Sequence, residues 1–323
     1  MSHTNMRLGV LALAAALVLG ACGDGNASGE EAGGEDGEVR TVTVGMAPIA
    51  TAGAIRAGME QGFFEKHGIE LKFETGTGGA ALLPSVVAGH IQFATATPVS
   101  LLQARDQGLE VRAIAGWTSA LEEGSNVNVV RALDPGITTA ADLQGKRVAV
   151  NTLNGMGDLT IREAVRSNGG DPDAVEFVEL PFPEMQAALE QRNIDAAWVP
   201  EPFGTLLEDA GAHVVTYPSD ESVPGHPSQL FFTSTELAES DPDLVEAMAA
   251  AIRESAAFAN ESPEAVREGA AEVVDIDPGI LKRIVLEQFN PEMPLERLTA
   301  LGELMYSDKM IKNPPDIEGL IGR

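Results

Sequence analysis

Beyond an N-terminal stretch considered below, the chain alternates short apolar runs with segments whose apolar side chains recur every three or four residues. The β-branched run 41–44 ends at a glycine, and the segment 52–66 then places Ile55, Met59 and Phe63 on one face of a helix. This order of strand, short loop and helix recurs in two blocks and predicts parallel sheets covered by helices. The predicted strands are 41–44, 69–75, 91–95, 111–117, 146–150, 175–180, 194–199, 213–217 and 229–233, and the predicted helices are 52–66, 80–88, 98–107, 158–168, 184–191 and 201–209.

The C-terminal part of the chain is predicted to be helical. Leu244, Met248, Ile252 and Ala256 recur at the spacing of one helical turn and mark one long amphipathic helix. Shorter helices are expected over residues 263–274, 278–287 and 294–306.

Two α/β blocks followed by a helical tail predict an α/β fold with two lobes. We expect the chain to pass between the lobes twice, near residues 126–131 and near residues 229–235. In open α/β sheets, ligands bind beyond the carboxyl ends of the strands, so two such sheets can face each other across a ligand cleft. Lobe 1 would then consist of residues 40–128 and 232–323, and lobe 2 of residues 129–231.

Residues 1–21 are typical of a secretory signal peptide. Arg7 supplies a positive charge, and the uncharged apolar run after it suits a signal sequence but is too short to span a bilayer. The run ends in the letters LGAC at Cys22, which resembles the bacterial lipoprotein signal, where the cysteine is lipidated. Cys22 is the single cysteine of the chain, so we expect it to be a lipid anchor. The alternative is an ordinary signal peptide followed by a chance cysteine.

Residues 22–39 are rich in glycine and acidic side chains, which predicts a flexible acidic tether. The whole chain has 21 Lys and Arg against 49 Asp and Glu, a net charge of −28. Nucleic-acid backbones require basic patches, so this charge excludes nucleic acid as a partner. A single cysteine also excludes an internal disulfide and a cysteine-based zinc site.

The sequence carries no recognised catalytic motif. A Walker loop, an H-E-x-x-H pair and a G-x-S-x-G elbow are absent, and the five histidines are scattered. No cysteine remains in the predicted folded part to act as a nucleophile. Together with export, these absences predict a protein that is not an enzyme and has no cofactor and no metal site.

Candidate ligand contacts fall at junctions between strands and helices, where free backbone N–H groups suit a polar or anionic ligand. Thr97 is placed to cap one helix, and a glycine-bearing loop with Asn151, Asn154, Gly155 and Met156 opens another. From these residues alone, plain helix capping is the simpler interpretation.

Four further candidates each have two interpretations. Gly78 and Gly79 either let a ligand approach the backbone or form a turn. Trp117 closes a strand and either forms a cleft wall or lies in the core. Glu201 lies between two prolines after a strand and is either a ligand contact or an acidic residue that favours the helix dipole.

Five short motifs occur in a specific order along the chain. They are VGMAP at 44–48, QGFFEKHGI at 61–69, AGHIQFA at 88–94, DLQGKRVAV at 142–150 and ALEQRNIDAAWVPEP at 188–202. In these motifs the chain resembles the substrate-binding proteins of bacterial ABC importers, in the group for nitrate, sulfonate, taurine and thiamine-pyrimidine precursors. The resemblance covers nearly all of residues 40–323.

The resemblance implies a periplasmic-binding-protein-like fold of type II, with two lobes that close over a small molecule. It also implies an ABC permease and ATPase as partners, and we expect a monomer outside the cytoplasm, anchored to the cell membrane by lipid. Ligand contacts are implied in the loop 46–50 with Met46 and Pro48, at Gly78, Gly79 and Thr97, in the loop 151–157, and at Glu201.

Two departures from the family pattern bear on the ligand. Gln92 stands where the family commonly has Asp, and residues 154–158 are not the Ser/Thr-rich loop associated with sulfonate binding. A sulfonate, nitrate or taurine-like ligand and a pyrimidine or aromatic ligand therefore both stay open. Two other functions are weighed as alternatives: an enzyme on the same fold, resembling a pyrimidine synthase, and a surface lipoprotein that acts only by protein interaction. The enzyme is disfavoured because such relatives use a Cys-rich motif.

Overall fold

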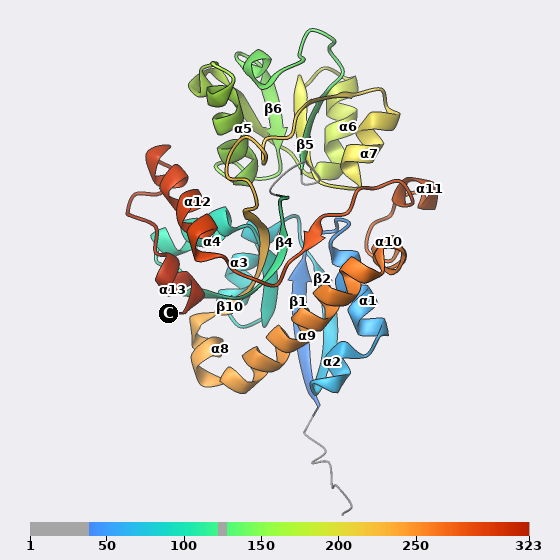
Figure 1. Ribbon diagram of the computed structural model, residues 1–323, viewed down its shortest axis with the longest axis vertical. Coiled ribbons are helices and arrows are strands. Elements are labelled where there is room, and N and C mark those ends of the chain that lie inside the picture. Colours follow the sequence, from blue (N-terminus) through green and yellow to red (C-terminus); the bar gives the residue numbers. More distant parts are fainter. Residues whose placement is uncertain (1–38, 122–127, 323) are drawn as a thin grey trace, which may run out of the picture. The chain divides into compact units, whose positions relative to one another are not determined.

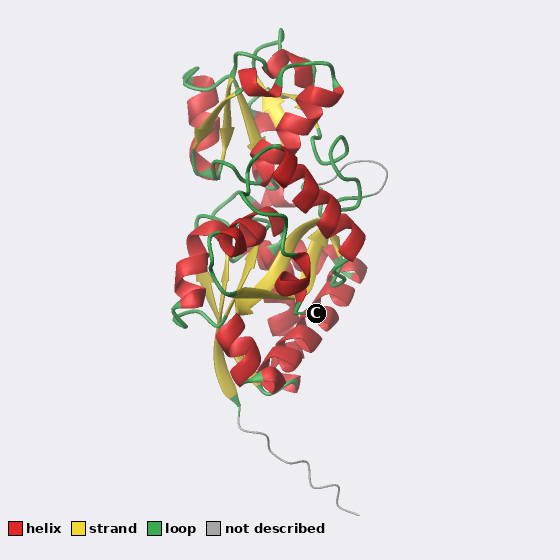
Figure 2. Cartoon of the chain, turned by 90° about the vertical axis from the view of Figure 1, so that its left-hand side faces the viewer, coloured by secondary structure: helices red, strands yellow, loops and turns green. Residues whose placement is uncertain are grey.

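The computed structural model describes residues 39–121 and 128–322. The predicted signal peptide, Cys22 and the tether up to residue 38 lie outside these residues. The described part contains two mixed β-sheets, each flanked by helices (Figures 1 and 2). The predicted α/β class is confirmed.

The first sheet has six strands. They are β1 (Arg40–Met46), β2 (Ile69–Thr75), β3 (Phe93–Ala96), β4 (Val111–Ser119), β10 (Pro227–Ser234) and β11 (Gln288–Phe289), in the spatial order β11-β4-β10-β3-β1-β2. β1 is parallel to β2 and β3, whereas β10 lies between β3 and β4 and is antiparallel to both. The parallel strands β1, β2, β3 and β4 therefore end at the same edge of the sheet, where β10 begins.

The second sheet has five strands. They are β5 (Val129–Ala132), β6 (Arg147–Val150), β7 (Glu176–Glu179), β8 (Ala196–Val199) and β9 (His213–Thr216), in the spatial order β7-β6-β8-β5-β9. β6 is parallel to β7 and β8, and β5 is antiparallel to β8 and β9. The expectation of parallel sheets is therefore wrong for β5 and β10. Each of them is the first strand after the chain has passed from one sheet to the other. Each therefore starts at the edge where the neighbouring strands end, and runs antiparallel to them.

Helices cover both sheets (Figure 1). They are α1 (Ala52–Glu60), α2 (Phe63–Lys66), α3 (Gly79–Val87), α4 (Pro98–Asp106), α5 (Met156–Ser167), α6 (Phe182–Glu190), α7 (Phe203–Asp209), α8 (Thr235–Ser240), α9 (Pro242–Glu261), α10 (Pro263–Ala271), α11 (Pro278–Leu281), α12 (Leu295–Ser307) and α13 (Ile317–Ile321). The long helix α9 begins at its cap Asp241, whose Oδ1 accepts a hydrogen bond from the Leu244 N–H at 3.0 Å. Its predicted apolar stripe, which includes Met248 and Ile252, is buried where α9 packs on α1 and β4.

Most predicted helices differ from the structure by one to three residues at an end, and two differ more. The helix expected over 52–66 divides into α1 and α2, because Gly62 adopts a left-handed conformation with φ 74°. The helix expected over 278–287 ends at Leu281, and the chain then leads through Glu287 into β11.

The chain passes between the sheets after β4 and again after β9. The expected lobe boundary between residues 231 and 232 is wrong, because it falls inside β10. This strand pairs with β3 and β4 of the first sheet, and its pairing with β4 begins at Pro227. The second passage therefore lies between residues 216 and 227.

Candidate functional site

A small cavity, called the polar cavity for the polar side chains among its lining residues, lies where the ends of strands from both sheets meet. Its volume is about 60 Å³, and it is lined by residues next to β1, β2, β3, β10 and β11 of the first sheet and β5, β6 and β8 of the second. This is the edge at which open α/β sheets bind ligands. The polar side chains that line this polar cavity are Thr95, Thr97, Asn128, Asn151, Ser228, Gln229 and Glu287.

An aromatic wall adjoins the polar cavity on the side of the second sheet. The Phe182 ring is stacked on Phe203 at 5.6 Å and lies 6.2 Å from the Trp198 ring. Trp198 is buried, and its indole N–H has no hydrogen-bond partner among the described residues. A buried donor without a partner costs free energy, so this N–H is suited to donate to a ligand.

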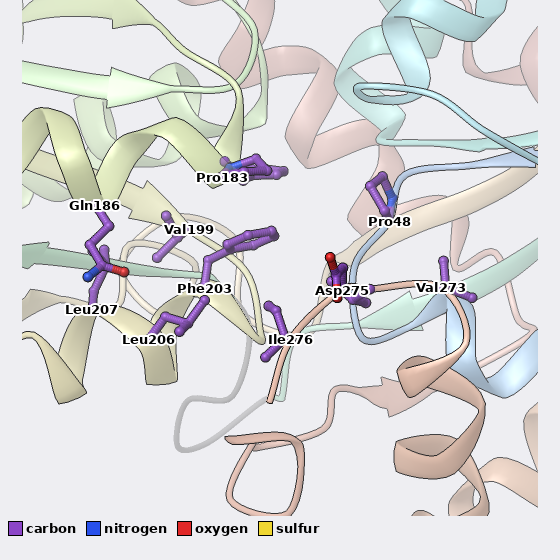
Figure 3. A pocket seen from close by; sticks show the side chains of 12 residues that line it. Pro48, Pro183, Gln186, Val199, Phe203, Leu206, Leu207, Val273, Asp275 and Ile276 are labelled. Carbon is purple, nitrogen blue, oxygen red and sulfur yellow. The ribbon is translucent and has the colours of Figure 1, made fainter. Parts of the chain in front are cut away.

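Two larger cavities are also lined by Phe182. The first is a mainly apolar cavity of about 350 Å³, in which side chains of α6 and α7 face Pro48 and the segment 273–276 (Figure 3). The second, of about 280 Å³, is lined by Pro48 and residues 75–77 opposite α6. Phe182 lines both of them and the polar cavity, so we refer to the three together as the cleft. A cleft of this kind has the apolar walls and few polar groups that are typical of small-molecule sites.

Glu287 places a buried carboxyl group at the polar cavity. Its Oε2 accepts a hydrogen bond from Ser228 Oγ at 2.6 Å, and the hydroxyl of Ser228 is 2.7 Å from that of Thr118. Thr118 also hydrogen bonds to the carboxyl group, and burial raises the pKa of Glu287. The three side chains come from β10, β4 and the residue before β11, which pairing in the first sheet brings together.

Several contacts join the two sides of the cleft. Gln103 of α4 donates to the carbonyl oxygen of Asn154 at 2.6 Å, and the Ala50 N–H donates to the carbonyl oxygen of Glu201 at 3.0 Å. Ion pairs join Asp308 with Arg166 of α5 at 2.6 Å, and Arg283 with Asp209 of α7 at 2.9 Å. The two sheets are thus already in contact around the cleft in this structure.

Five of the sequence candidates line the cleft. Gly78, Gly79, Thr97 and Asn151 surround the polar cavity, and Pro48 lines both larger cavities. Thr97 also caps α4, since its Oγ1 accepts a hydrogen bond from the Ser100 N–H at 3.2 Å. A Cβ atom built on Gly78 would lie 2.9 Å from Asn151 Nδ2, so these two residues approach each other across the cleft.

Met46 and Trp117 are core residues and do not line the cleft. Both are fully buried. The Trp117 ring makes edge contacts with Phe231 and Phe289, each at a centroid distance of 5.1 Å. The interpretation of Trp117 as a cleft wall is therefore corrected in favour of its core alternative.

Asn154, Gly155 and Met156, the other candidates of the loop before α5, stabilise local structure and do not line the polar cavity. The Asn154 N–H donates to Asp158 Oδ2 at 2.7 Å, which fixes the loop before α5, and Gly155 is the residue that precedes this helix. Met156 is buried as its first residue. Burial raises the pKa of Asp158 to about 7.

Glu201 has its own partners outside the polar cavity. Its carboxyl oxygens accept hydrogen bonds from the N–H and the hydroxyl of Thr205, each at 3.0 Å. Burial raises the pKa of Glu201. Its side chain lines a separate cavity of about 130 Å³ together with Arg131 and Arg283.

Four residues that shape the cleft were not predicted from the sequence: Phe182, Trp198, Ser228 and Glu287. Trp198 stands in the motif at 188–202, near the end of the predicted strand 194–199. Trp117 also ends a predicted strand, and the sequence does not show which of the two tryptophans lines a cleft. The sequence predicts a helix that includes Glu287, so nothing in it indicates that this residue lies beside the end of a strand. The proline on each side of Phe182 was the one available hint of a turn that presents this ring.

Two other features are absent from the described part of the chain, a cluster of metal-ligating side chains and a membrane-spanning helix. No group of three or more His, Cys, Asp or Glu side chains in this part of the chain could hold a metal ion. None of the helices of residues 39–121 and 128–322 is long and apolar enough to cross a membrane.

Two α/β sheets with a cleft lined from the strand ends of both define a two-lobed solute-binding protein. The chain belongs to the NMT1/THI5-like family, whose model matches residues 49–266. The predicted resemblance to substrate-binding proteins of ABC importers is thereby confirmed.

Relatives and solved structures are consistent with this class. A binding protein of Brucella abortus is 26% identical over 226 residues, which are 69% of this chain and 68% of that protein. The nitrate/nitrite binding protein NrtA of Synechococcus elongatus is 25% identical over 75% of this chain and 62% of its own. The alkanesulfonate-binding protein SsuA of Xanthomonas axonopodis bound to MOPS superposes with a TM-score of 0.74 at 15% identity, covering 88% of this chain and 98% of SsuA. Each of the three carries the name of a binding protein.

Proposed function

We propose that the protein is the extracytoplasmic solute receptor of an ABC importer and acts as a monomer. It captures a small molecule in the cleft and presents the closed complex to a permease and its ATPase. The observation that supports this most directly is that the polar cavity takes its lining from both sheets, with Gly78 on one side and Asn151 on the other. A ligand that contacts both sides binds the closed form better and so shifts the population toward it.

A panel of small molecules tests this function. We expect at least one compound among nitrate, ethanesulfonate, taurine, organic amines, pyrimidines and aromatic acids to raise the melting temperature. A ligand at a hundred times its Kd stabilises the folded state by about 2.7 kcal/mol. Small-angle scattering should show a smaller radius of gyration with the same compound. A protein that no small molecule stabilises would contradict the proposal.

Phe182 should be central to capture, because its ring lines every part of the cleft. We expect Phe182→Ala to weaken binding of the stabilising compound at least tenfold, measured by titration calorimetry. Phe63→Ala is the matched control, since Phe63 pairs edge-on with Phe258 in the contact between α2 and α9. Both variants should lose stability, and only the first should lose affinity. Equal affinities would show that the ligand binds elsewhere.

We further propose that Cys22 carries the lipid that holds the protein at the cell membrane. The sequence supports this through the apolar run and small residues before the single cysteine. In a bacterial host fed a labelled fatty acid, the wild-type protein should carry the label and sediment with membranes. Cys22→Ser should carry no label. A labelled Cys22→Ser protein would contradict the anchor.

A further inference from the structure

Glu287 is the one ionisable side chain among the described residues that line the polar cavity. The other polar side chains there are neutral hydroxyls and amides, such as those of Thr97, Asn128 and Asn151. No lysine, arginine or histidine of the described chain lines this cavity. The one charge that a described side chain can present in the polar cavity is therefore negative. Burial raises the pKa of Glu287 and so favours its neutral form until a positive group pairs with it.

The carboxyl group of Glu287 is buried without a positive partner. Its hydrogen-bond donors are the neutral hydroxyls of Ser228 and Thr118, and it forms no ion pair with any described residue. A buried carboxylate is costly unless a positive group pairs with it. The two hydroxyls hold the carboxyl group in position at the cavity, which leaves the pairing charge to be supplied from outside the chain.

We infer that Glu287 is the specificity-determining residue of the cleft and selects a ligand that carries a positively charged nitrogen group. This inference rests on the proposed function. An ammonium, guanidinium or amidinium group in the polar cavity would pair with the Glu287 carboxylate. The apolar or aromatic remainder of such a ligand would lie against Phe182 in the larger cavities. An oxyanion in the polar cavity would instead disfavour the ionised form of Glu287, and no cationic side chain of the described residues lines this cavity to pair with the anion.

Three probes with the same benzene ring and different charge test this inference. Benzamidine carries an amidinium group on a benzene ring, benzamide is its neutral analogue, and benzenesulfonate is an anion with the same ring. Guanidinium and ethylammonium widen the cationic set, and nitrate and ethanesulfonate widen the anionic set. For the wild-type protein we expect cationic probes to raise the melting temperature, and benzamidine to bind at least tenfold more tightly than benzamide.

Glu287→Gln keeps the shape of the side chain and removes its charge. We expect this variant to bind the cationic probe at least tenfold more weakly than the wild type. Glu292→Gln changes an exposed glutamate of the same segment and should leave affinity unchanged. The comparison of benzamidine with benzamide needs no variant, so it decides the point even if Glu287→Gln folds poorly.

The outcomes separate this inference from the proposed function. Stabilisation by an anion that Glu287→Gln retains would overturn the role of Glu287 while supporting the solute receptor. A cationic probe that binds Glu287→Gln as well as the wild type would also overturn it. If neither set of probes nor the wider panel raises the melting temperature, the proposed function is overturned. This inference is then overturned as well.

Discussion

Gly79→Ala is expected to destabilise the protein by about 3 kcal/mol and to weaken ligand binding. A Cβ atom at this position would lie 2.4 Å from Ala96 Cα and 2.6 Å from the carbonyl oxygen of Thr95. Both contacts are with backbone, so a side-chain rotation cannot relieve them. The first turn of α3 would have to move away from the end of β3, and Thr97 at the polar cavity would no longer keep its position relative to Gly78.

Urea unfolding and calorimetric titration measure the two effects. Gly136→Ala is the matched control, because a Cβ there would meet only the flexible Asp134 side chain, at 3.2 Å, on an exposed turn. A Gly79→Ala protein as stable as Gly136→Ala would mean that α3 can shift without cost. The close approach of α3 to β3 would then have no role in shaping the cleft.

Asp158→Asn is expected to make the protein more stable than the wild type at pH 8 but not at pH 4. Asp158 is 4% exposed and stands in the first turn of α5; burial raises its pKa from 3.8 to about 7. A carboxyl group whose pKa is raised in the folded state favours folding below its unfolded pKa. That contribution is lost as the pH rises from about 4 through about 7. The full loss corresponds to at most about 4 kcal/mol, at 1.36 kcal/mol per pKa unit.

The free energy of unfolding of both proteins, measured between pH 4 and pH 8, gives the test. The wild-type curve should fall relative to the Asp158→Asn curve as the pH rises. Asp243→Asn serves as control, since Asp243 occupies the first turn of α9 but is exposed, and its curve should follow the wild type. Curves for wild type and Asp158→Asn that run parallel would show that Asp158 is ionised in the fold.

The fold class could be predicted because strand and helix periods differ along most of the chain. The direction of β5 and β10 could not, because a strand has the same apolar pattern whichever way it runs. The division of α1 from α2 depends on the left-handed conformation of Gly62. Sequence alone does not distinguish that conformation from an ordinary glycine inside a helix.

The part of the candidate site that lies in loops after strands could be predicted from the sequence. Thr97 and Asn151 follow strands directly, Gly78 lies in the turn between β2 and α3, and Gly79 begins α3. Parallel strands of one sheet end at one edge. Glu287 could not be predicted as a site residue from the sequence. It reaches the site because β11 pairs with β4, and these two strands are far apart in the sequence. Trp117 and Trp198 both lie near the ends of strands, and only the packing of the rings around each shows which one reaches the cleft.

The place of β10 between β3 and β4 decides which stretches of chain can assemble by themselves. The second sheet is drawn from one continuous stretch, from β5 to β9, so all of its strands are present once β9 has been synthesised. β3 and β4 have no common neighbour until β10 has been synthesised, more than a hundred residues after β4. Pairing over such separations carries a large loop-closure entropy and is slow. An N-terminal fragment that ends before β11 therefore lacks a complete first sheet, and Ser228, Gln229 and Glu287 are the last lining residues of the polar cavity to be synthesised.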